Sequence, residues 1–364
     1  MKYDAIIVGG GVLGLSLAYH LSVQGMHVVL FEREPLPGMH ASGRNAGMIR
    51  QLYRHEQLTD WARRSIALWP EPIRDKCFQK TGSIIAGRVS PDHHPDLFET
   101  REVRSRSQPG NAVPAVFTAG DGLLDSPAYM QALFSLCDKR KAEFHLRTRI
   151  SAAQLNNSVW NVCTEDGVHC SAPRLINCCG AWANEMLGGE LSHFGIKLLA
   201  YVRHLFLIDG WPIDYMPAAD CGFYWHEADR WYLRRWDQST RLVSICDEQP
   251  ADPDNYVPTS SIDERVSEIL LDALPEAAAS TRIVRSWHCF RTYADDQLPV
   301  WGEDPDLPGL FWLAGFGGFG MSTSFAATFD ACAHLCGENV KVPAEFSAVR
   351  LKQSTFQSRL GTLL

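Results

Sequence analysis

The segment YDAIIVGGGVLGLSLAYHLSVQGMHVVLFER, residues 3–33, decides the fold of this chain. Residues 4–9 are a short β-branched apolar run of the kind that forms a strand buried on both faces. An alanine- and leucine-rich helical pattern follows the glycines and ends at Gly25, and residues 27–32 form a second apolar run. This order of strand, turn, helix and strand predicts a βαβ unit at the start of an α/β domain.

Three glycines of this unit, Gly9, Gly11 and Gly14, have the spacing G-x-G-x-x-G. The first permits the tight turn, the second lets the backbone approach a pyrophosphate, and the third lets the helix pack closely on the strand. Glu32 follows Gly14 by 18 residues, where it can accept hydrogen bonds from a ribose diol. The alternative is a glycine turn kept only for packing. We predict a dinucleotide site that also includes Val12, Leu13 and Arg33.

The composition bounds the size and the partners of the protein. At 364 residues, 46% hydrophobic and 21% charged, the chain has the composition of a globular protein and the length for two domains. The net charge of −8 leaves no basic excess for nucleic acid, which we exclude as a partner. With neither a secretory signal pattern nor a run of about 18 apolar residues, we expect no transmembrane segment and a cytoplasmic location.

The eleven cysteines predict neither disulfides nor a metal site. They are scattered without the paired spacing of a zinc finger, and Cys178 and Cys179 are adjacent, so we interpret them as reduced. Cys332, His334 and Cys336 lie in a helical pattern, with alanine and leucine between them and no second pair nearby. Burial of small apolar residues explains this group better than metal binding.

The polar, glycine-punctuated stretch FEREPLPGMHASGRNAG, residues 31–47, decides which dinucleotide is expected. It resembles the segment after the second strand in the D-amino-acid oxidase superfamily of FAD enzymes, the group of sarcosine oxidases, glycine oxidases and D-arginine dehydrogenases. In that family the segment wraps the pyrophosphate and the inner edge of the flavin. The resemblance implies FAD as cofactor, held in part by Ser42, Gly43, Arg44, Asn45, Ala46, Gly47 and Met48.

A second stretch, RLINCCGAWANEML at residues 174–187, resembles the family's second cofactor strand. Cys178 and Cys179 stand where alanines are usual, and cysteine fits as a small buried apolar residue. A vicinal redox pair is the alternative. The resemblance adds Gly180 and Trp182 to the cofactor site, together with Ile150, whose backbone would face the adenine.

A second glycine-rich turn occurs late in the chain, in LFWLAGFGGFGMSTS at residues 310–324. An apolar strand precedes it and a helical pattern follows, so the turn leads into a helix amino terminus with unpaired N–H groups and partial positive charge. Such a terminus suits the pyrimidine edge of a reduced, anionic flavin, although close packing of helix on strand is the alternative. The predicted residues of this turn are Gly317, Gly318, Phe319, Gly320, Met321 and Ser322.

Cofactor segments at the start, middle and end of the chain imply a discontinuous FAD domain of Rossmann type. We assign residues 1–76, 136–199 and 286–364 to this domain. The remaining residues, 77–135 and 200–285, form the substrate domain. The second of these insertions is strand-like and aromatic, so we expect a mostly antiparallel sheet that roofs the flavin.

Arg291, in SWHCFRTYADDQLPVWGE at residues 286–303, is the best candidate for binding a substrate carboxylate. The segment resembles the family's arginine motif, and a guanidinium presents a fixed fork of donors that matches a carboxylate. A surface arginine is the alternative. Tyr232 resembles a tyrosine that holds the carboxylate or shields the site, though a half-buried sheet residue is equally expected. Tyr53 and Arg203 are weaker candidates of the same kind.

Two departures from the family pattern concern the substrate, and one retained cysteine concerns the cofactor linkage. Met48 and Ser83 replace a histidine and a glutamate of the D-arginine dehydrogenases, so we do not expect specificity for arginine or lysine. Cys289 matches a cysteine that sarcosine oxidases join covalently to the flavin, but we expect a free thiol. Three aromatic residues could line an apolar pocket or form the core of the roof: Phe223, Tyr224 and Trp225.

Together these patterns predict FAD-dependent oxidation of a D-amino acid or a small N-substituted amino acid to the imino acid, by hydride transfer to flavin. The partners would be a small carboxylate substrate and, as electron acceptor, oxygen or a quinone. One rival is a 2-hydroxy acid dehydrogenase, which would need a base such as His204 or His288. The other is a flavin-binding subunit without turnover of its own.

Overall fold

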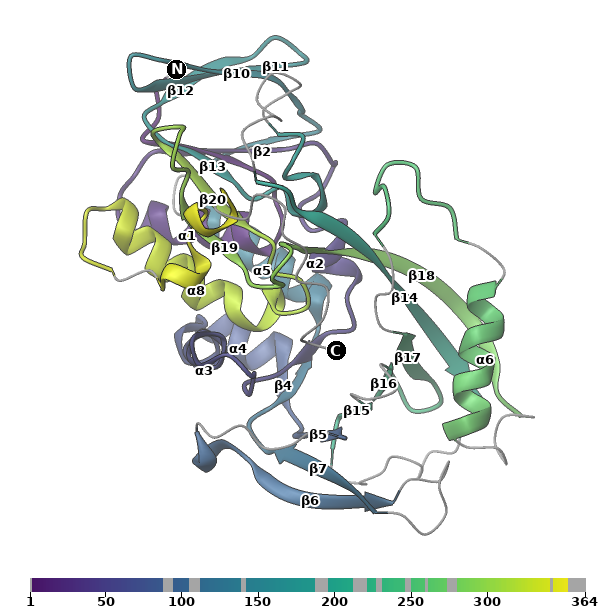
Figure 1. Ribbon diagram of the computed structural model, residues 1–364. Helices are drawn as coiled ribbons and strands as arrows, with labels where there is room; N and C mark the ends of the chain where they lie inside the picture. The colour runs from purple at the N-terminus through teal and green to yellow at the C-terminus, as the bar shows by residue number, and fades with distance from the viewer. Residues whose placement is uncertain are drawn as a thin grey trace.

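The computed structural model describes residues 2–87, 94–104, 112–138, 142–186, 196–211, 221–226, 231–245, 250–258, 261–273, 280–340 and 343–352. Within these residues the chain forms a six-stranded sheet, an eight-stranded sheet and two small sheets of three strands each (Figure 1). The predicted fold class, a Rossmann-type α/β domain joined to a mostly antiparallel sheet, is confirmed. Among the described residues, no helix has the length and apolar character needed to cross a bilayer.

The six-stranded sheet is parallel except at one edge, where β19 runs antiparallel to β20. Its central strands come from the three segments in which the sequence showed cofactor motifs. Three of these central strands, Ala5–Val8, Leu175–Asn177 and Leu310–Ala314, are short and fully buried, as expected for a sheet that is covered on both faces. In spatial order the strands are β19 (Val300–Glu303), β20 (Leu310–Ala314), β13 (Leu175–Asn177), β1 (Ala5–Val8), β2 (Val28–Glu32) and β9 (Glu143–Leu146).

Successive side chains of β1 point to opposite faces of this sheet and so belong to two separate hydrophobic clusters. Ala5 and Ile7 belong to a large cluster with the helices, which lie together beside the sheet in Figure 1. Ile6 and Val8 belong to a second cluster with a small sheet of β10 (Ile150–Asn156), β11 (Val159–Thr164) and β12 (His169–Ala172). The helices of the first cluster are α1 (Val12–Val23), α3 (Glu56–Leu68), α4 (Glu71–Cys77), α5 (Ser126–Asp138) and α8 (Gly320–Leu335). Two one-turn helices lie outside it, α2 (Ala41–Arg44) and α9 (Val349–Lys352), and Leu351 of α9 packs on the second cluster.

The eight-stranded sheet is antiparallel except for one parallel pair, β15 with β5. Its order is β18 (Arg282–Tyr293), β14 (Leu199–Asp209), β17 (Arg241–Ile245), β16 (Trp231–Arg235), β15 (Phe223–His226), β5 (Ser83–Ala86), β7 (Ala112–Thr118) and β6 (Glu99–Arg104). Both predicted insertions therefore contribute to one sheet. The predicted domain boundary at residue 286 falls inside β18, which pairs with β14 along nearly its whole length.

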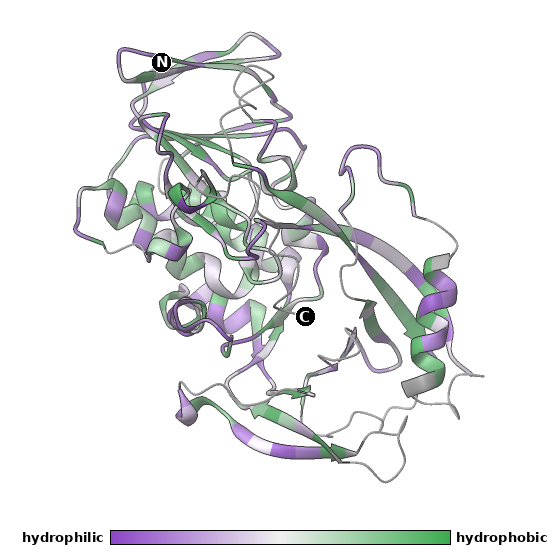
Figure 2. Ribbon diagram, viewed as in Figure 1, coloured by the Kyte–Doolittle hydropathy of each residue, from purple (hydrophilic) through white to green (hydrophobic). Residues whose placement is uncertain are grey.

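Helix α6 (Ser261–Ala273) packs on this sheet, and its ribbon alternates between hydrophilic and hydrophobic residues (Figure 2). Val266 and Leu270, one helical turn apart, are buried in the cluster that lies on this face, whereas Leu271 is exposed. The remaining small sheet consists of β3 (Met48–Ile49), β8 (Gly122–Leu124) and β4 (Phe78–Lys80). The short 3-10 helices are η1 (Pro95–Leu97), η2 (Gly180–Trp182) and η3 (Ala344–Phe346).

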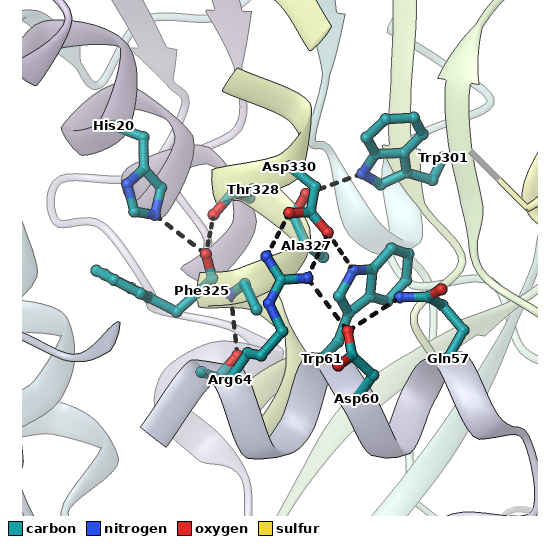
Figure 3. Close-up of polar contacts among 12 residues, drawn as sticks. His20, Gln57, Asp60, Trp61, Arg64, Trp301, Phe325, Ala327, Thr328 and Asp330 are labelled. Carbon is teal, nitrogen blue, oxygen red and sulfur yellow. Dashed lines mark hydrogen bonds and ion pairs between the residues drawn. The ribbon is translucent and has the colours of Figure 1, made fainter. Parts of the chain in front are cut away.

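A polar network joins α3 to α8 and so fixes the helix that follows the second glycine turn (Figure 3). The two Arg64 Nη atoms donate to the two Asp330 carboxylate oxygens at 2.9 and 2.6 Å, and Trp61 Nε1 donates to Asp330 Oδ2 at 2.8 Å. Asp330 raises the pKa of Arg64 above its ordinary value. From the adjoining strand β19, Trp301 Nε1 donates to the Ala327 carbonyl at 2.9 Å.

We predict that Asp330→Asn lowers the free energy of unfolding by about 2 kcal/mol, because it breaks a bidentate, partly buried ion pair. Urea denaturation measures this. Asp60→Asn is the matched control, since Asp60 binds the same guanidinium at 3.1 Å with a side chain that is 45% exposed. The control should cost about 0.5 kcal/mol or less. Equal effects of the two variants would contradict the assignment of Asp330 as the anchor of α8.

His20 on α1 predicts a dependence of stability on pH. Its Nε2 bonds the Phe325 carbonyl at 3.0 Å, and burial lowers its pKa to about 4. The unfolded chain binds this proton at its ordinary pKa of about 6.5, so the stabilisation is present above that pH and is lost as the pH falls toward 4. The contribution amounts to about 2 kcal/mol between about pH 7 and pH 5.

The measurement is urea denaturation of wild type and His20→Gln at these two pH values. Glutamine keeps a donor for the Phe325 carbonyl but does not titrate. The variant should therefore lose about 2 kcal/mol less than wild type on acidification. Parallel losses in the two proteins would show that His20 is not the titrating group.

Candidate functional site

The first glycine turn connects β1 to α1, and two of its three motif glycines have no room for a Cβ. Gly9 has a φ of +102°, and a Cβ there would lie 2.5 Å from the Cys178 carbonyl oxygen. A Cβ at Gly14 would overlap the carbonyl oxygen of Gly9. Gly11, by contrast, lines a cleft, and the nearest atom to its ideal Cβ is Ser42 Oγ at 3.2 Å. The geometry matches the three functions expected of a phosphate-binding turn.

Glu32 lies at the end of β2 with both carboxylate oxygens oriented by backbone donors. Its Oε2 accepts from the Gly10 N–H at 2.7 Å, and its Oε1 accepts from the Glu34 N–H at 2.9 Å. Each oxygen keeps acceptor capacity for a ligand hydroxyl. The side chain lines the same cleft as Gly11, so a carboxylate of defined orientation stands beside the glycine turn.

The cleft holds about 1280 Å³ of unfilled space, part of it open to solvent, and runs from the first glycine turn to the second. The predicted cofactor residues that line it are Gly9, Gly11, Val12, Leu13, Glu32, Arg33, Ser42, Ile150, Gly180, Trp182, Gly317 and Gly320. Segments more than 300 residues apart in the chain meet here because β20 lies next but one to β1 in the sheet.

Other cleft residues carried no signal that we used in the sequence. Thr148 lies in the cleft because its N–H donates to the Glu32 carbonyl at 2.9 Å, an effect of the parallel pairing of β2 with β9. Phe290 and Thr292, on alternate positions of β18, also line it. Cys179 lines it too, and burial raises its pKa above the ordinary value, which keeps the thiol protonated.

Residues 42–48 hold one another in place more than they face the cleft. Ser42 Oγ accepts from the Val12 N–H at 2.9 Å, at the start of α1. The Asn45 amide donates to the Ser42 carbonyl at 2.7 Å, and its oxygen accepts from the Gly47 N–H at 2.7 Å. Gly14, Gly43, Arg44, Asn45, Ala46, Gly47 and Met48 were predicted cofactor residues that do not line this cleft.

Two contacts tie this segment to the eight-stranded sheet. Arg234 donates to the Ala46 carbonyl at 2.6 Å, and Trp287 Nε1 donates to the Arg44 carbonyl at 2.8 Å. Met48 packs in a cluster with Ala46 and Tyr232. The loop that follows β2 therefore lies between the cleft and the sheet that was expected to form the roof.

Trp182 forms one rim of the cleft. The Arg33 guanidinium stacks on its ring at 3.9 Å, and the His40 ring lies 4.5 Å away between centroids. Asp254 Oδ1 accepts from Trp182 Nε1 at 2.9 Å and from Arg33 Nη2 at 3.3 Å. Asp254 belongs to the segment 250–258, which lies between β17 and α6 in the chain. The rim therefore includes a residue from the part of the chain that forms the eight-stranded sheet.

The second glycine turn lies against β18. Gly317 has a φ of +44°, and a Cβ there would overlap the ring of Tyr293. A Cβ at Gly318 would lie 3.0 Å from Arg291 Nη1, so the guanidinium occupies the space beside the turn. Phe319 packs edge-on against the Tyr53 ring at 5.3 Å between centroids. Phe319 and Met321 pack on the helical core, and Ser322 Oγ accepts from the Arg50 N–H at 3.1 Å.

The candidate substrate residues come together on one face of the β14–β18 pair. Tyr201 lies opposite Arg291 and Arg203 lies opposite Cys289, so these four share a face. The Arg203 guanidinium lies 5.2 Å from the ring of Tyr232 on β16. Burial raises the pKa of Tyr232, and the charges of Arg203 and Arg291 oppose this. The structure thus joins Arg291, Arg203 and Tyr232, whereas Tyr53 packs on Phe319 beside the second glycine turn.

The two histidines considered as bases lie on the opposite face. His204 lies opposite His288 in the register, and the Tyr256 hydroxyl shares a hydrogen bond of 2.7 Å with His204 Nε2. The His288 ring lies 5.1 Å from the Tyr256 ring, and burial lowers its pKa. Neither histidine faces the side of the sheet that carries Arg291.

Tyr224 and Trp225 on β15 take the two different roles that the sequence allowed, core of the roof and lining of an apolar pocket. Tyr224 is buried in the cluster that packs under α6, so it belongs to the core of the roof. Trp225 lies opposite Tyr232 and packs in the cluster with Met48 and Cys289. Arg50 stacks on Trp225 at 4.2 Å. Sequence reasoning missed this arginine because a charged residue after a polar loop is typical of the surface.

Three comparisons with known proteins bear on this site. A family model described as FAD dependent oxidoreductase (DAO) matches residues 4–328. The uncharacterized oxidoreductase YurR of Bacillus subtilis is 25% identical over 359 residues, which cover 87% of this chain and 90% of YurR. Monomeric sarcosine oxidase of Bacillus sp. (strain B-0618) is 29% identical over 210 residues, 51% of this chain and 53% of the oxidase. Glycine oxidase of Geobacillus kaustophilus superposes with a TM-score of 0.76 at 20% identity, over 95% of this chain and 98% of the oxidase.

Proposed function

The chain belongs to the DAO family of FAD-dependent oxidoreductases, and from this we propose that it oxidises the amine of a D-amino acid or of a small N-substituted amino acid. The family match confirms the resemblance found in residues 31–47, and it confirms FAD as the cofactor. FAD, when bound, would supply the acceptor for the hydride that leaves the α-carbon of the substrate. The imino acid product hydrolyses in water to a keto acid, and oxygen or a quinone would take up the electrons.

The cleft fits FAD by its shape and by its donors and acceptors. The first glycine turn leaves bare backbone and a helix amino terminus for the pyrophosphate, and Ser42 stands at that terminus. Glu32 would accept the hydroxyls of the ribose. The second turn, with Gly317 and Gly320 in the lining of the cleft, would hold the ring system.

The position of Arg291 is the single observation that carries the proposal. Its guanidinium lies beside Gly318 of the second turn, on the same face of the sheet as Arg203 and Tyr232. A guanidinium at the end of a flavin cleft can hold a carboxylate and so orient the neighbouring α-carbon toward the cofactor. Met48, Trp225 and Tyr232 supply an apolar wall that excludes water from this side.

Oxidation of a 2-hydroxy acid lacks support from the geometry. That reaction needs a base near the substrate carbon, whereas His204 and His288 lie on the face opposite Arg291. An amine needs no such base if it reacts in its neutral form. A flavin-binding subunit without turnover is the outcome that an experiment must exclude.

Anaerobic bleaching of the yellow flavin absorbance tests the proposal. The purified holoprotein is mixed with a panel of D-amino acids, N-methyl amino acids and 2-hydroxy acids, and the spectrum is followed without oxygen. Bleaching by an amino acid supports the proposal. Bleaching only by a hydroxy acid, or by no compound, would overturn it in favour of the corresponding rival.

We predict that Cys289 is not joined to the flavin. It is 5% exposed and packs with Ala46, Leu205 and Leu242. Cys289 is also not among the residues that line the cleft, so its sulfur is not placed for attack on the flavin methyl group. Acid precipitation should therefore release the yellow colour into the supernatant. Colour that stays with the protein in wild type, and is released from Cys289→Ala, would show a covalent bond.

A further inference from the structure

Arg50, directly after β3, places a buried positive charge beside the proposed substrate site. The residue is 8% exposed. Its guanidinium carbon lies 4.2 Å from the centre of the Trp225 ring and 4.6 Å from that of the Tyr53 ring. Its backbone N–H donates to Ser322 Oγ on α8. Two aromatic faces and a backbone anchor thus hold the guanidinium in one place.

Among the described residues, no carboxylate forms an ion pair with Arg50, and its buried Nη1 has no hydrogen-bond partner. The buried carboxylate of Asp121 accepts instead from the Gln51 N–H at 2.8 Å and from Ser83 Oγ at 2.6 Å. Aromatic rings attract the cation but do not accept its N–H bonds as a carboxylate does. A buried guanidinium of this kind is suited to an anion that arrives with a ligand.

Arg50 and Arg291 both lie near the second glycine turn and the start of α8. Arg291 lies against Gly318. Arg50 reaches the next residues, since it stacks on Tyr53, which packs on Phe319, and its backbone bonds Ser322. Residues of the eight-stranded sheet also connect the two arginines. Arg50 stacks on Trp225, which lies opposite Tyr232 in the sheet. Burial raises the pKa of Tyr232, and the charge of Arg291 opposes this rise.

We propose that the site takes a substrate with two carboxylates, one bound by Arg291 and the other by Arg50. This inference rests on the proposed function and deepens it, since the substrate class becomes the amino dicarboxylates. Arg291 holds the carboxylate next to the reacting carbon. The edge of the Arg50 guanidinium, whose face is covered by Trp225 and Tyr53, pairs with the distal carboxylate.

Binding of unreactive acids tests the inference without any turnover. Perturbation of the flavin spectrum is titrated with succinate, glutarate and adipate, and with butyrate and valerate as monocarboxylates of similar length. In wild type, the best dicarboxylate should bind about tenfold to a hundredfold more tightly than its monocarboxylate counterpart. Arg50→Met should remove this difference and leave the affinity for monocarboxylates unchanged. Arg282→Met, at the exposed end of β18, is the matched control and should change neither affinity.

Thermal unfolding without ligand separates a binding role from a structural one. Removal of an uncompensated buried charge should leave the Tm of Arg50→Met unchanged or raise it, whereas a stabilising stack on Trp225 would lower it. Arg50→Lys serves as the second variant and should keep part of the preference for dicarboxylates. Equal affinities for the two classes of acid in wild type, or equal losses for both in Arg50→Met, would overturn the inference. Preferential binding of dicarboxylates without bleaching by any amino acid would overturn the proposed function alone.

Discussion

Arg291→Ala is expected to lower kcat/KM for the amino acid substrate by about a hundredfold to a thousandfold, while FAD stays bound. The loss corresponds to about 3 to 4 kcal/mol, the range for removal of one partner from a buried, hydrogen-bonded charge pair. FAD retention should be preserved because Arg291 is not among the residues that line the cleft, to which β18 contributes Phe290 and Thr292. Steady-state kinetics and the ratio of flavin to protein measure the two quantities.

Arg291→Lys sharpens the assignment. An ammonium keeps the charge but cannot reproduce the fork of donors, so most of the activity should still be lost. Arg282→Met provides the control on the same strand, because Arg282 pairs with Asp209 at the exposed far end. Wild-type kcat/KM in both Arg291 variants would remove this residue from the substrate site.

Gly14→Ala is expected to abolish FAD retention, with a loss of affinity of about a hundredfold or more. A Cβ at this position would overlap the Gly9 carbonyl oxygen and contact the Cys178 side chain at 3.5 Å. Both neighbours belong to strands or turns of the central sheet, so the helix must move away from β1 to make room. That movement displaces the first N–H groups of α1 from the phosphate site. Absorbance of the purified variant near 450 nm, per mole of protein, measures the effect.

A control on the same helix distinguishes this effect from a general loss of stability. Val23 is 45% exposed at the carboxyl end of α1, and Val23→Ala should keep the flavin content of wild type. The apo form of each variant is also titrated with FAD, which separates weak binding from loss during purification. A yellow Gly14→Ala protein with wild-type affinity would show that close contact of α1 with the turn is not needed for binding.

The sequence by itself determined the cofactor half of this protein. The strand, the turn and the helix of residues 3–33 form from neighbours in the chain, so the positions of Gly9, Gly14 and Glu32 follow from spacing alone. The second glycine turn was predictable for the same reason, since Gly317 and Gly318 lie between a local strand and a local helix. The fold class followed as well, because consecutive strands and helices of this pattern allow few arrangements.

Only the tertiary structure decided how the substrate half is arranged. The register of β14 against β18 places Arg203 and Cys289 on one face with Arg291, and it turns His204 and His288 to the other. A shift of one residue would exchange these faces, and the sequence does not state the register. The position of Arg50 between Tyr53 and Trp225 depends on contact between segments that lie more than 170 residues apart. Such contacts result from the packing of the two sheets, so they cannot be predicted from local sequence patterns.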